Sequence, residues 1–164
     1  MRECKCIAQL PESITQCTEL VELSLSKCMA LTSLPQNIPE MVNLEDLVLT
    51  KCKGFTALPD NLGKCRSLAL LDLRACKNLE SLPDSLGGLS HLRHLNLSTC
   101  KKLKEIPASI GNLPSLEYLD ITNCQSLMKL PDSLKAVKSI TVGWDDIMKQ
   151  ISRKNEGIRT FSMG

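Results

Sequence analysis

Apolar and polar residues alternate along this chain in a pattern that repeats every 24 residues. The start of each unit alternates with period two, which predicts a short strand, and the rest places an apolar residue at every third or fourth position. A proline at position 16 excludes a helix across the unit, so we expect an irregular or 3₁₀ return. The units read L-x-x-L-x-L-x-x-C-x-x-L-x-x-L-P-x-x-I/L-x-x-L-x-x and begin at Leu20, Leu44, Leu68, Leu92 and Leu116.

Equal units of this kind predict a solenoid, in which coils stack and successive strands pair in one parallel sheet. One unit alone buries too little apolar surface to offset the entropy of ordering its backbone, so each coil depends on its neighbours. The fold class we expect is α/β: a leucine-filled, curved horseshoe segment. It has a parallel sheet on the concave face, an irregular or 3₁₀ convex side and a C-terminal capping helix.

The two ends depart from the repeat. We assign residues 1–142 to the solenoid, with a truncated first repeat (1–19), full repeats from residue 20 and a shortened last repeat ending in a strand near 138–142. Residues 143–164 have the pattern of a helix that covers the last coil, and a membrane-binding amphipathic helix is the alternative. Because the chain opens in mid-repeat, we expect either a fragment of a longer protein or a short gene product that self-associates through an exposed apolar end.

Six cysteines occupy one position of the repeat, directly after the strand. Each thiol is expected to be buried and to donate a hydrogen bond to a carbonyl of the next coil. We interpret them as reduced thiols that form a structural ladder, because one cysteine per coil cannot converge on a metal ion. Neighbouring strands are close enough for a disulfide, so spacing alone leaves cross-linking open. The ladder comprises Cys4, Cys28, Cys52, Cys76, Cys100 and Cys124.

Composition argues against several classes of function. The net charge of +2 arises from 20 basic and 18 acidic residues with no run of one sign, unlike the footprint of a nucleic-acid-binding protein. No segment reaches the ~20 apolar residues of a membrane span, and the first residues lack the apolar core of a signal peptide. We expect a cytoplasmic or nuclear location, no cofactor, no metal, and no nucleic-acid or membrane partner. The H-x-x-H pair of His91 and His94 is interpreted as ordinary repeat positions.

Three segments resemble the C-terminal repeats of plant nucleotide-binding leucine-rich-repeat (NLR) immune receptors: LPDSLGGL (82–89), IPASIGNLPSLEYLDI (106–121) and NCQSLMKLP (123–131). Intracellular signalling scaffolds with L-P-x-x-I repeats are similar in pattern but usually carry Asn where this chain has Cys. The resemblance implies a curved recognition or regulatory surface that binds a pathogen effector, a host signalling protein or a nucleotide-binding module. No G-x-x-x-x-G-K-[ST] loop occurs in this sequence, so the nucleotide switch of that family is absent from it.

The candidate partner-binding surface is the concave face, where the side chains that flank the buried strand leucines point outward. Tyr118 and Trp144 are its candidate aromatic anchors, and packing of Trp144 under the terminal helix is an open alternative. The predicted surface comprises Leu70, Asp72, Arg74, His94, Asn96, Tyr118, Asp120 and Trp144.

We expect a non-enzymatic protein-interaction domain, with the repeat region of a plant-type immune receptor as the first reading and an intracellular signalling scaffold as the second. A hydrolase would use Ser98, His94 and an aspartate such as Asp72 or Asp120. Regular strands on an open surface provide it with no oxyanion hole or sheltered pocket. An extracellular receptor domain is a further reading, and oxidised ladder thiols would identify it.

Overall fold

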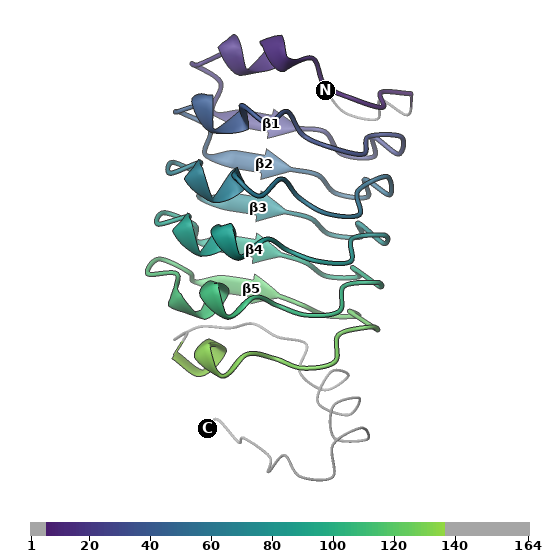
Figure 1. Cartoon of the computed structure of the whole chain (residues 1–164), viewed down its shortest axis with the longest axis vertical. Helices are drawn as coiled ribbons and strands as arrows, with labels where there is room; N and C mark the ends of the chain where they lie inside the picture. The colour runs from purple at the N-terminus through teal and green to yellow at the C-terminus, as the bar shows by residue number, and fades with distance from the viewer. Residues whose placement is uncertain (1–5, 137–164) are drawn as a thin grey trace.

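The computed structural model describes residues 6–136, and this part of the chain is a stack of coils with one parallel sheet along its side (Figure 1). Each strand follows its predecessor in space as in sequence, and the register joins residues 24 apart, such as Leu71 with Leu95. The predicted solenoid is therefore confirmed. The strands are β1 (Glu22–Ser24), β2 (Asp46–Val48), β3 (Leu70–Asp72), β4 (His94–Asn96) and β5 (Tyr118–Asp120).

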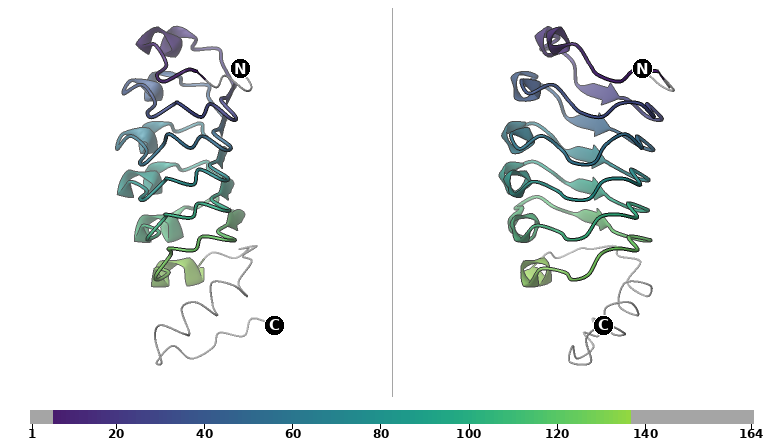
Figure 2. Two further views of the ribbon diagram at one scale, coloured as in Figure 1. Left: turned by 90° about the vertical axis from the view of Figure 1, so that its right-hand side faces the viewer. Right: turned by 45° about the vertical axis from the view of Figure 1, so that its right-hand side comes forward.

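Each coil returns through a short 3₁₀ helix on the side opposite the sheet (Figure 2). The repeat proline closes the first turn, because its carbonyl accepts the N–H three residues later, as from Leu62 to Pro59 and from Ile110 to Pro107. Proline has no backbone N–H that would need a partner at this position, and its ring fixes φ for the turn. The helices are η1 (Glu12–Gln16), η2 (Ile38–Glu40), η3 (Leu62–Lys64), η4 (Asp84–Gly88), η5 (Ala108–Asn112) and η6 (Asp132–Ala136).

The core lies between the sheet and the 3₁₀ helices and is filled almost entirely by leucine. Leu71, Leu73, Leu95 and Leu97 are fully buried, as are their counterparts in neighbouring coils. Phe55 is the one aromatic side chain in this core among the residues described. Leucines of equal size at equal heights pack coil upon coil, which is why a chain with 2% aromatic residues can bury a continuous interior.

A left-handed residue precedes each buried ladder cysteine, from Cys28 to Cys124, and turns the backbone inward. These residues have φ between 56° and 64°, although none is glycine. The backbone N–H groups of the first four donate to the following coil, as from Thr99 to the Thr122 carbonyl at 2.7 Å. The inter-coil hydrogen bond and the packing of the cysteine therefore hold a conformation that costs an L-residue about 1 kcal/mol. The five residues are Lys27, Lys51, Ala75, Thr99 and Asn123.

Glycine allows the 3₁₀ helices to approach closely in the C-terminal half of the stack. A Cβ built on Gly63 would lie 1.7 Å from the Ser85 carbonyl oxygen of the next coil. Gly87 and Gly111 meet the equivalent serine of their own next coil in the same way. No side chain fits at this position unless the two coils separate.

Several expectations fall outside the described residues: the last strand near 138–142, the helix at 143–164 and the positions of Cys4 and Trp144. Within residues 6–136, no helix has the length and apolar character needed to cross a bilayer.

Candidate functional site

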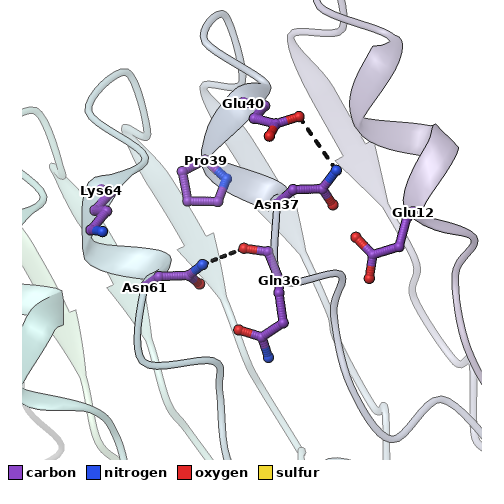
Figure 3. A pocket seen from close by; sticks show the side chains of 7 residues that line it. All are labelled: Glu12, Gln36, Asn37, Pro39, Glu40, Asn61 and Lys64. Carbon is purple, nitrogen blue, oxygen red and sulfur yellow. Dashed lines mark hydrogen bonds between the residues drawn. The ribbon is translucent and has the colours of Figure 1, made fainter.

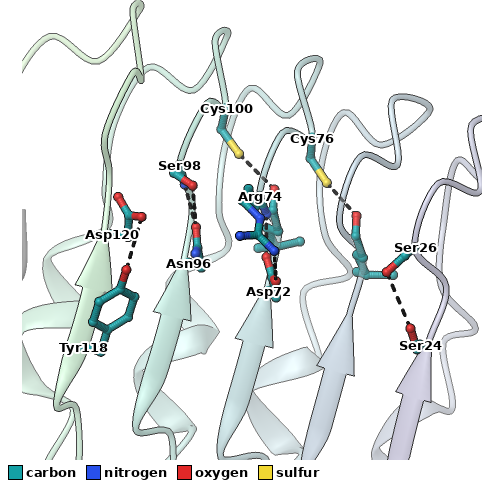
Figure 4. Close-up of polar contacts among 12 residues, drawn as sticks. Ser24, Ser26, Asp72, Arg74, Cys76, Asn96, Ser98, Cys100, Tyr118 and Asp120 are labelled. Carbon is teal, nitrogen blue, oxygen red and sulfur yellow. Dashed lines mark hydrogen bonds and ion pairs between the residues drawn. The ribbon is translucent and has the colours of Figure 1, made fainter. Parts of the chain in front are cut away.

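The cysteine ladder is buried and hydrogen-bonded, as expected, but the direction of its bonds differs from the prediction. Cys76 Sγ donates to the Leu49 carbonyl at 3.1 Å and Cys100 Sγ donates to the Leu73 carbonyl at 3.2 Å, so each thiol bonds to the preceding coil (Figure 4). Cys52 and Cys124 repeat the arrangement at 3.0 and 3.2 Å. The backbone N–H of the residue before Cys52, Cys76 and Cys100 already donates to the following coil, so the thiol supplies the bond in the opposite direction.

Burial keeps these thiols protonated. It raises the pKa of the Cys52 thiol to about 11 and that of the Cys76 thiol to about 12, and the neighbouring cysteines of the column add to the effect. It also raises the pKa of the Cys100 thiol, and it raises that of Cys124 to about 12. A thiol with such a pKa is almost fully protonated at neutral pH and is a poor nucleophile or metal ligand. The ladder therefore contributes to stability and not to chemistry.

The sheet face, defined as the outward side chains of β1–β5, is the side predicted to be concave. Its first row brings Leu70, His94 and Tyr118 side by side, because the register pairs Leu70 with His94 and His94 with Tyr118. The rings of His94 and Tyr118 have centroids 6.0 Å apart at an interplanar angle of 41°. Leu70 and Tyr118 are half-buried and His94 is exposed. Three of the predicted partner-binding residues thus form one contiguous strip.

The second row of predicted site residues, Asp72, Asn96 and Asp120, forms hydrogen-bonded turns at the ends of the strands. Asp72 Oδ1 accepts the Arg74 N–H at 2.9 Å, and Asn96 Oδ1 accepts the Ser98 N–H at 3.0 Å. Asp120 does the same for the N–H two residues further along, at 2.9 Å. These are Asx turns, in which the side chain replaces a backbone acceptor. The three residues therefore have a structural role in addition to the binding role predicted for them, a role that their turn-forming chemistry could have indicated.

Tyr118, in the strip, and Arg74, two residues beyond the end of β3, are each held by a neighbouring aspartate. The Tyr118 hydroxyl donates to Asp120 Oδ2 at 3.2 Å, and Arg74 Nη2 lies 3.4 Å from Asp72 Oδ2 (Figure 4). Partial burial, together with the nearby Asp120 carboxylate, raises the pKa of the Tyr118 hydroxyl. Both side chains present large surfaces in preset orientations, which lowers the entropy lost on binding.

The residues of the hydrolase alternative do not form a triad. Ser98 is only 6% exposed, and its hydroxyl donates to Asn96 Oδ1 at 2.7 Å. The His94 ring packs beside Tyr118, and within residues 6–136 no hydrogen bond joins His94 to Ser98. A nucleophile needs a base within hydrogen-bond reach, so this arrangement does not activate Ser98.

A further polar ladder runs along the turns that lead into the strands and was missed in the sequence. His91 Nδ1 lies 2.8 Å from the Arg66 carbonyl oxygen, and Ser115 Oγ donates to the Ser90 carbonyl at 2.9 Å, each 25 residues back. Asn43 repeats the bond at 3.0 Å. The interpretation of His91 as an ordinary repeat position is confirmed. In the part of the chain described, no three His, Cys, Asp or Glu side chains come together as metal ligands would.

A shallow pocket lies on the opposite side of the stack, between η1, η2 and η3 (Figure 3). Asn61 Nδ2 donates to the Gln36 carbonyl across its floor, and Asn37 Nδ2 donates to Glu40 Oε2 at 3.3 Å. The two amide nitrogens are hydrogen-bonded, whereas Asn37 Oδ1 and Asn61 Oδ1 are buried without a hydrogen-bond partner in the described chain, and the surface is open. The pocket therefore lacks the enclosed, largely apolar wall of a small-molecule site.

Comparisons with known proteins agree with this geometry. The family model described as "Leucine-rich repeat region" matches residues 52–142, more than half of the chain, so the chain belongs to the leucine-rich repeat family. Domains of this kind are protein-interaction modules. The comparison with curated proteins found no similar sequence.

Solved structures with the same fold include a type III effector and the ectodomains of plant receptor kinases. The leucine-rich repeat domain of the type III effector XopL is 28% identical with a TM-score of 0.62, covering 82% of this chain and 57% of that one. The ectodomain of the receptor kinase SOBIR1 from Arabidopsis thaliana is 24% identical with a TM-score of 0.64, covering 80% and 71%. The ectodomain of the plant receptor kinase GASSHO1/SCHENGEN3 from Arabidopsis thaliana, in complex with CASPARIAN STRIP INTEGRITY FACTOR 2, is 26% identical with a TM-score of 0.53, covering 82% and 19%. The chain thus spans little more than half of the XopL domain.

Proposed function

We propose that the chain is a non-enzymatic recognition domain that binds a partner protein on the strip formed by Leu70, His94 and Tyr118 with Arg74. The observation that carries this proposal is the adjacency of an aliphatic, an imidazole and a phenol side chain on three consecutive strands. Tyrosine and arginine are among the residues that contribute most to protein interfaces, especially near an apolar centre. Apart from Val48, the other outward side chains of the strands are small or polar, which suits an interface rim.

The partner we infer is a pathogen effector, a host signalling protein or a nucleotide-binding module, within a plant-type intracellular immune receptor. Support for this finer assignment comes from the NLR-like segments at 82–89, 106–121 and 123–131. The GASSHO1/SCHENGEN3 ectodomain, in complex with another protein, supports a binding role for a related repeat array. An intracellular signalling scaffold remains the second candidate, favoured by the L-P-x-x-I pattern of the repeats.

We also propose an intracellular location. The four ladder thiols of Cys52, Cys76, Cys100 and Cys124 form no disulfide, and each donates a hydrogen bond to a carbonyl, a role that a disulfide would abolish. Cytosolic reductants preserve such thiols, whereas oxidising compartments favour disulfides. Mass spectrometry of the native protein tests this assignment, since disulfide-linked ladder peptides would instead identify an extracellular domain.

Site-specific photo-cross-linking in plant cell extract tests the binding surface. A photoreactive amino acid at position 94, which is exposed on the strip, is expected to give a discrete protein adduct. The same probe at Ala108, exposed on η5 on the opposite side, is expected to give none. Tyr118→Ala should reduce the adduct because truncating an interface anchor costs about 1–3 kcal/mol of binding. Equal labelling from both positions would refute the proposed surface.

The identity of the adduct then separates the candidate roles. A pathogen effector or a nucleotide-binding module supports the immune-receptor assignment, and a kinase or GTPase supports the signalling scaffold. An extracellular peptide hormone as the adduct would contradict both.

A further inference from the structure

The fold separates charges that are scattered along the sequence. The turns that follow the strands line the right-hand side of the stack in Figure 1, and they carry seven lysines against one acidic residue, Glu80. We call this surface the lysine edge; it comprises residues 27–32, 51–56, 75–80 and 99–104. Its lysines are Lys27, Lys51, Lys53, Lys77, Lys101, Lys102 and Lys104.

The opposite edge of the stack has the reverse charge. It runs from the residue after each repeat proline to the first residue of the next strand, over residues 12–22, 36–46, 60–70, 84–94 and 108–118. Three basic residues lie there, Lys64, Arg66 and Arg93, among nine acidic ones. The acidic residues are Glu12, Glu19, Glu22, Glu40, Glu45, Asp46, Asp60, Asp84 and Glu117. The net charge of +2 therefore hides a strong asymmetry across the molecule.

The solenoid does not need lysine on this edge. Position 10 of the repeat holds Lys53, Lys77 and Lys101, yet Met29 and Gln125 occupy the same position in other coils. Neighbouring coils lie about 4.8 Å apart at the sheet, so stacked lysines repel one another and destabilise the fold. A row of like charges that costs stability and is not required by the repeat indicates a binding role.

Most of these charges are available. Lys51, Lys53, Lys77 and Lys102 are exposed, and within residues 6–136 none of them makes an ion pair. Lys104 Nζ, by contrast, forms an ion pair with Glu80 Oε2 at 2.8 Å.

We propose that the lysine edge binds an acidic α-helix of a partner protein, laid along the axis of the stack. A helix with Glu or Asp on one face presents a carboxylate every turn, or 5.4 Å, which is close to the coil spacing of about 4.8 Å. The mismatch amounts to about 2 Å over three steps, which a lysine side chain with four rotatable bonds absorbs. The partner's charge complements the edge, and its period matches the coils.

Other polyanions fit the lysine edge less well. Single-stranded nucleic acids are bound through stacking on aromatic side chains, and the edge carries none, since Phe55 is fully buried. Interfacial membrane binding combines lysines with several inserted apolar side chains. Of the exposed large apolar residues in the described chain, Val21 and Val42 lie on the opposite edge, and Met128 alone adjoins the lysine edge, next to Lys104. Both remain outcomes of the test.

The test uses the full chain and a labelled, alanine-rich helical peptide with four glutamates on one face. Fluorescence anisotropy at low salt, about 50 mM, measures its Kd, and a second peptide with the same glutamates distributed around the helix is the sequence control. The variant carries Lys53→Gln, Lys77→Gln and Lys101→Gln, which copies the residue found naturally at Gln125. A matched variant removes the same charge from the opposite edge through Lys64→Gln, Arg66→Gln and Arg93→Gln.

The proposal predicts that the lysine-edge variant raises the Kd of the one-faced peptide at least about tenfold, whereas the opposite-edge variant changes this Kd less than about twofold. The distributed peptide should bind the wild-type chain more weakly than the one-faced peptide does. Equal effects of the two variants, or equal binding of the two peptides, would overturn it. So would tighter, Lys53-dependent binding to phosphatidylserine vesicles or to a single-stranded oligonucleotide than to the peptide. Dimerisation in sedimentation velocity that the lysine-edge variant abolishes would assign the edge to a second copy of the chain instead. Tyr118→Ala should leave peptide binding unchanged, which keeps this result separate from the proposed function.

Discussion

Replacing Gly63 with alanine tests how closely the coils are stacked. The added Cβ would lie 1.7 Å from the Ser85 carbonyl oxygen and 2.4 Å from its carbon, whereas real Cβ contacts do not fall below 3.0 Å. Because the obstacle is backbone and not a flexible side chain, η3 and η4 must part by more than about 1 Å. The coils on either side are packed to the same spacing, so the strain cannot be relieved by one rotamer change.

The expected loss of stability follows from two opposing effects. Overpacking of a well-packed core costs typically about 1–3 kcal/mol, and a backbone clash belongs at the upper end of that range. Alanine also restricts the unfolded chain, which returns about 0.4–1 kcal/mol. The net expectation is a loss of about 2 kcal/mol. With a urea m-value of about 2 kcal/mol/M, the unfolding midpoint should fall by about 1 M.

Urea unfolding followed by circular dichroism measures this shift. Lys64→Ala is the matched control, since the adjacent Lys64 side chain is exposed and its removal should move the midpoint by less than about 0.3 M. A Gly63→Ala protein as stable as the wild type, or more stable, would refute the close stacking of the 3₁₀ helices.

Three further predictions concern single residues. Thr99 is β-branched and has φ of 64°, so Thr99→Asn should stabilise the fold by about 1 kcal/mol in the same urea assay, and a loss would contradict the strain assigned there. Asp120→Ala removes an acceptor from two hydrogen bonds of one Asx turn and should cost about 1–2 kcal/mol, whereas an unchanged midpoint would mean that the turn does not depend on this side chain. The hydrogen bond from Lys104 lowers the pKa of the Glu80 carboxyl. The stabilisation from this pair is therefore present above the carboxyl's unfolded-state pKa and is lost as pH falls through its lowered folded-state pKa. NMR titration of Lys104→Gln should find the Glu80 pKa raised toward its ordinary value, and no rise would exclude the pair.

Much of the fold could be predicted from the sequence because its period is visible in it. The 24-residue spacing of leucine, cysteine and proline predicted the strands, the 3₁₀ returns and the buried ladder, and all three are confirmed for residues 6–136. The predicted direction of the thiol hydrogen bonds was wrong, because each thiol bonds to the preceding coil and not to the next one. The observed direction depends on the left-handed residue before each cysteine, and Lys51, Ala75 and Thr99 give no sign of a positive φ, which glycine would have indicated.

The candidate site was harder to predict, since the outward side chains of the strands differ from coil to coil. The strand pattern placed Leu70, His94 and Tyr118 on one face, and the register brings them together. It did not reveal that Asp120 would also accept a hydrogen bond from the Tyr118 hydroxyl, because that depends on the side-chain conformations at the end of β5. The charge asymmetry was also hidden, since lysines that are far apart in sequence become neighbours only when the coils stack.

The central structural claim is that the coils stack in register around one buried column of thiols, and native-state alkylation with peptide mass spectrometry tests it most directly. Cys6 and Cys17 are exposed and should react within minutes at pH 8. The thiols from Cys28 to Cys124 in the ladder should remain unlabelled and become reactive together as the protein unfolds in urea. Rapid labelling of Cys76 or Cys100 in the native protein would contradict the stacked column.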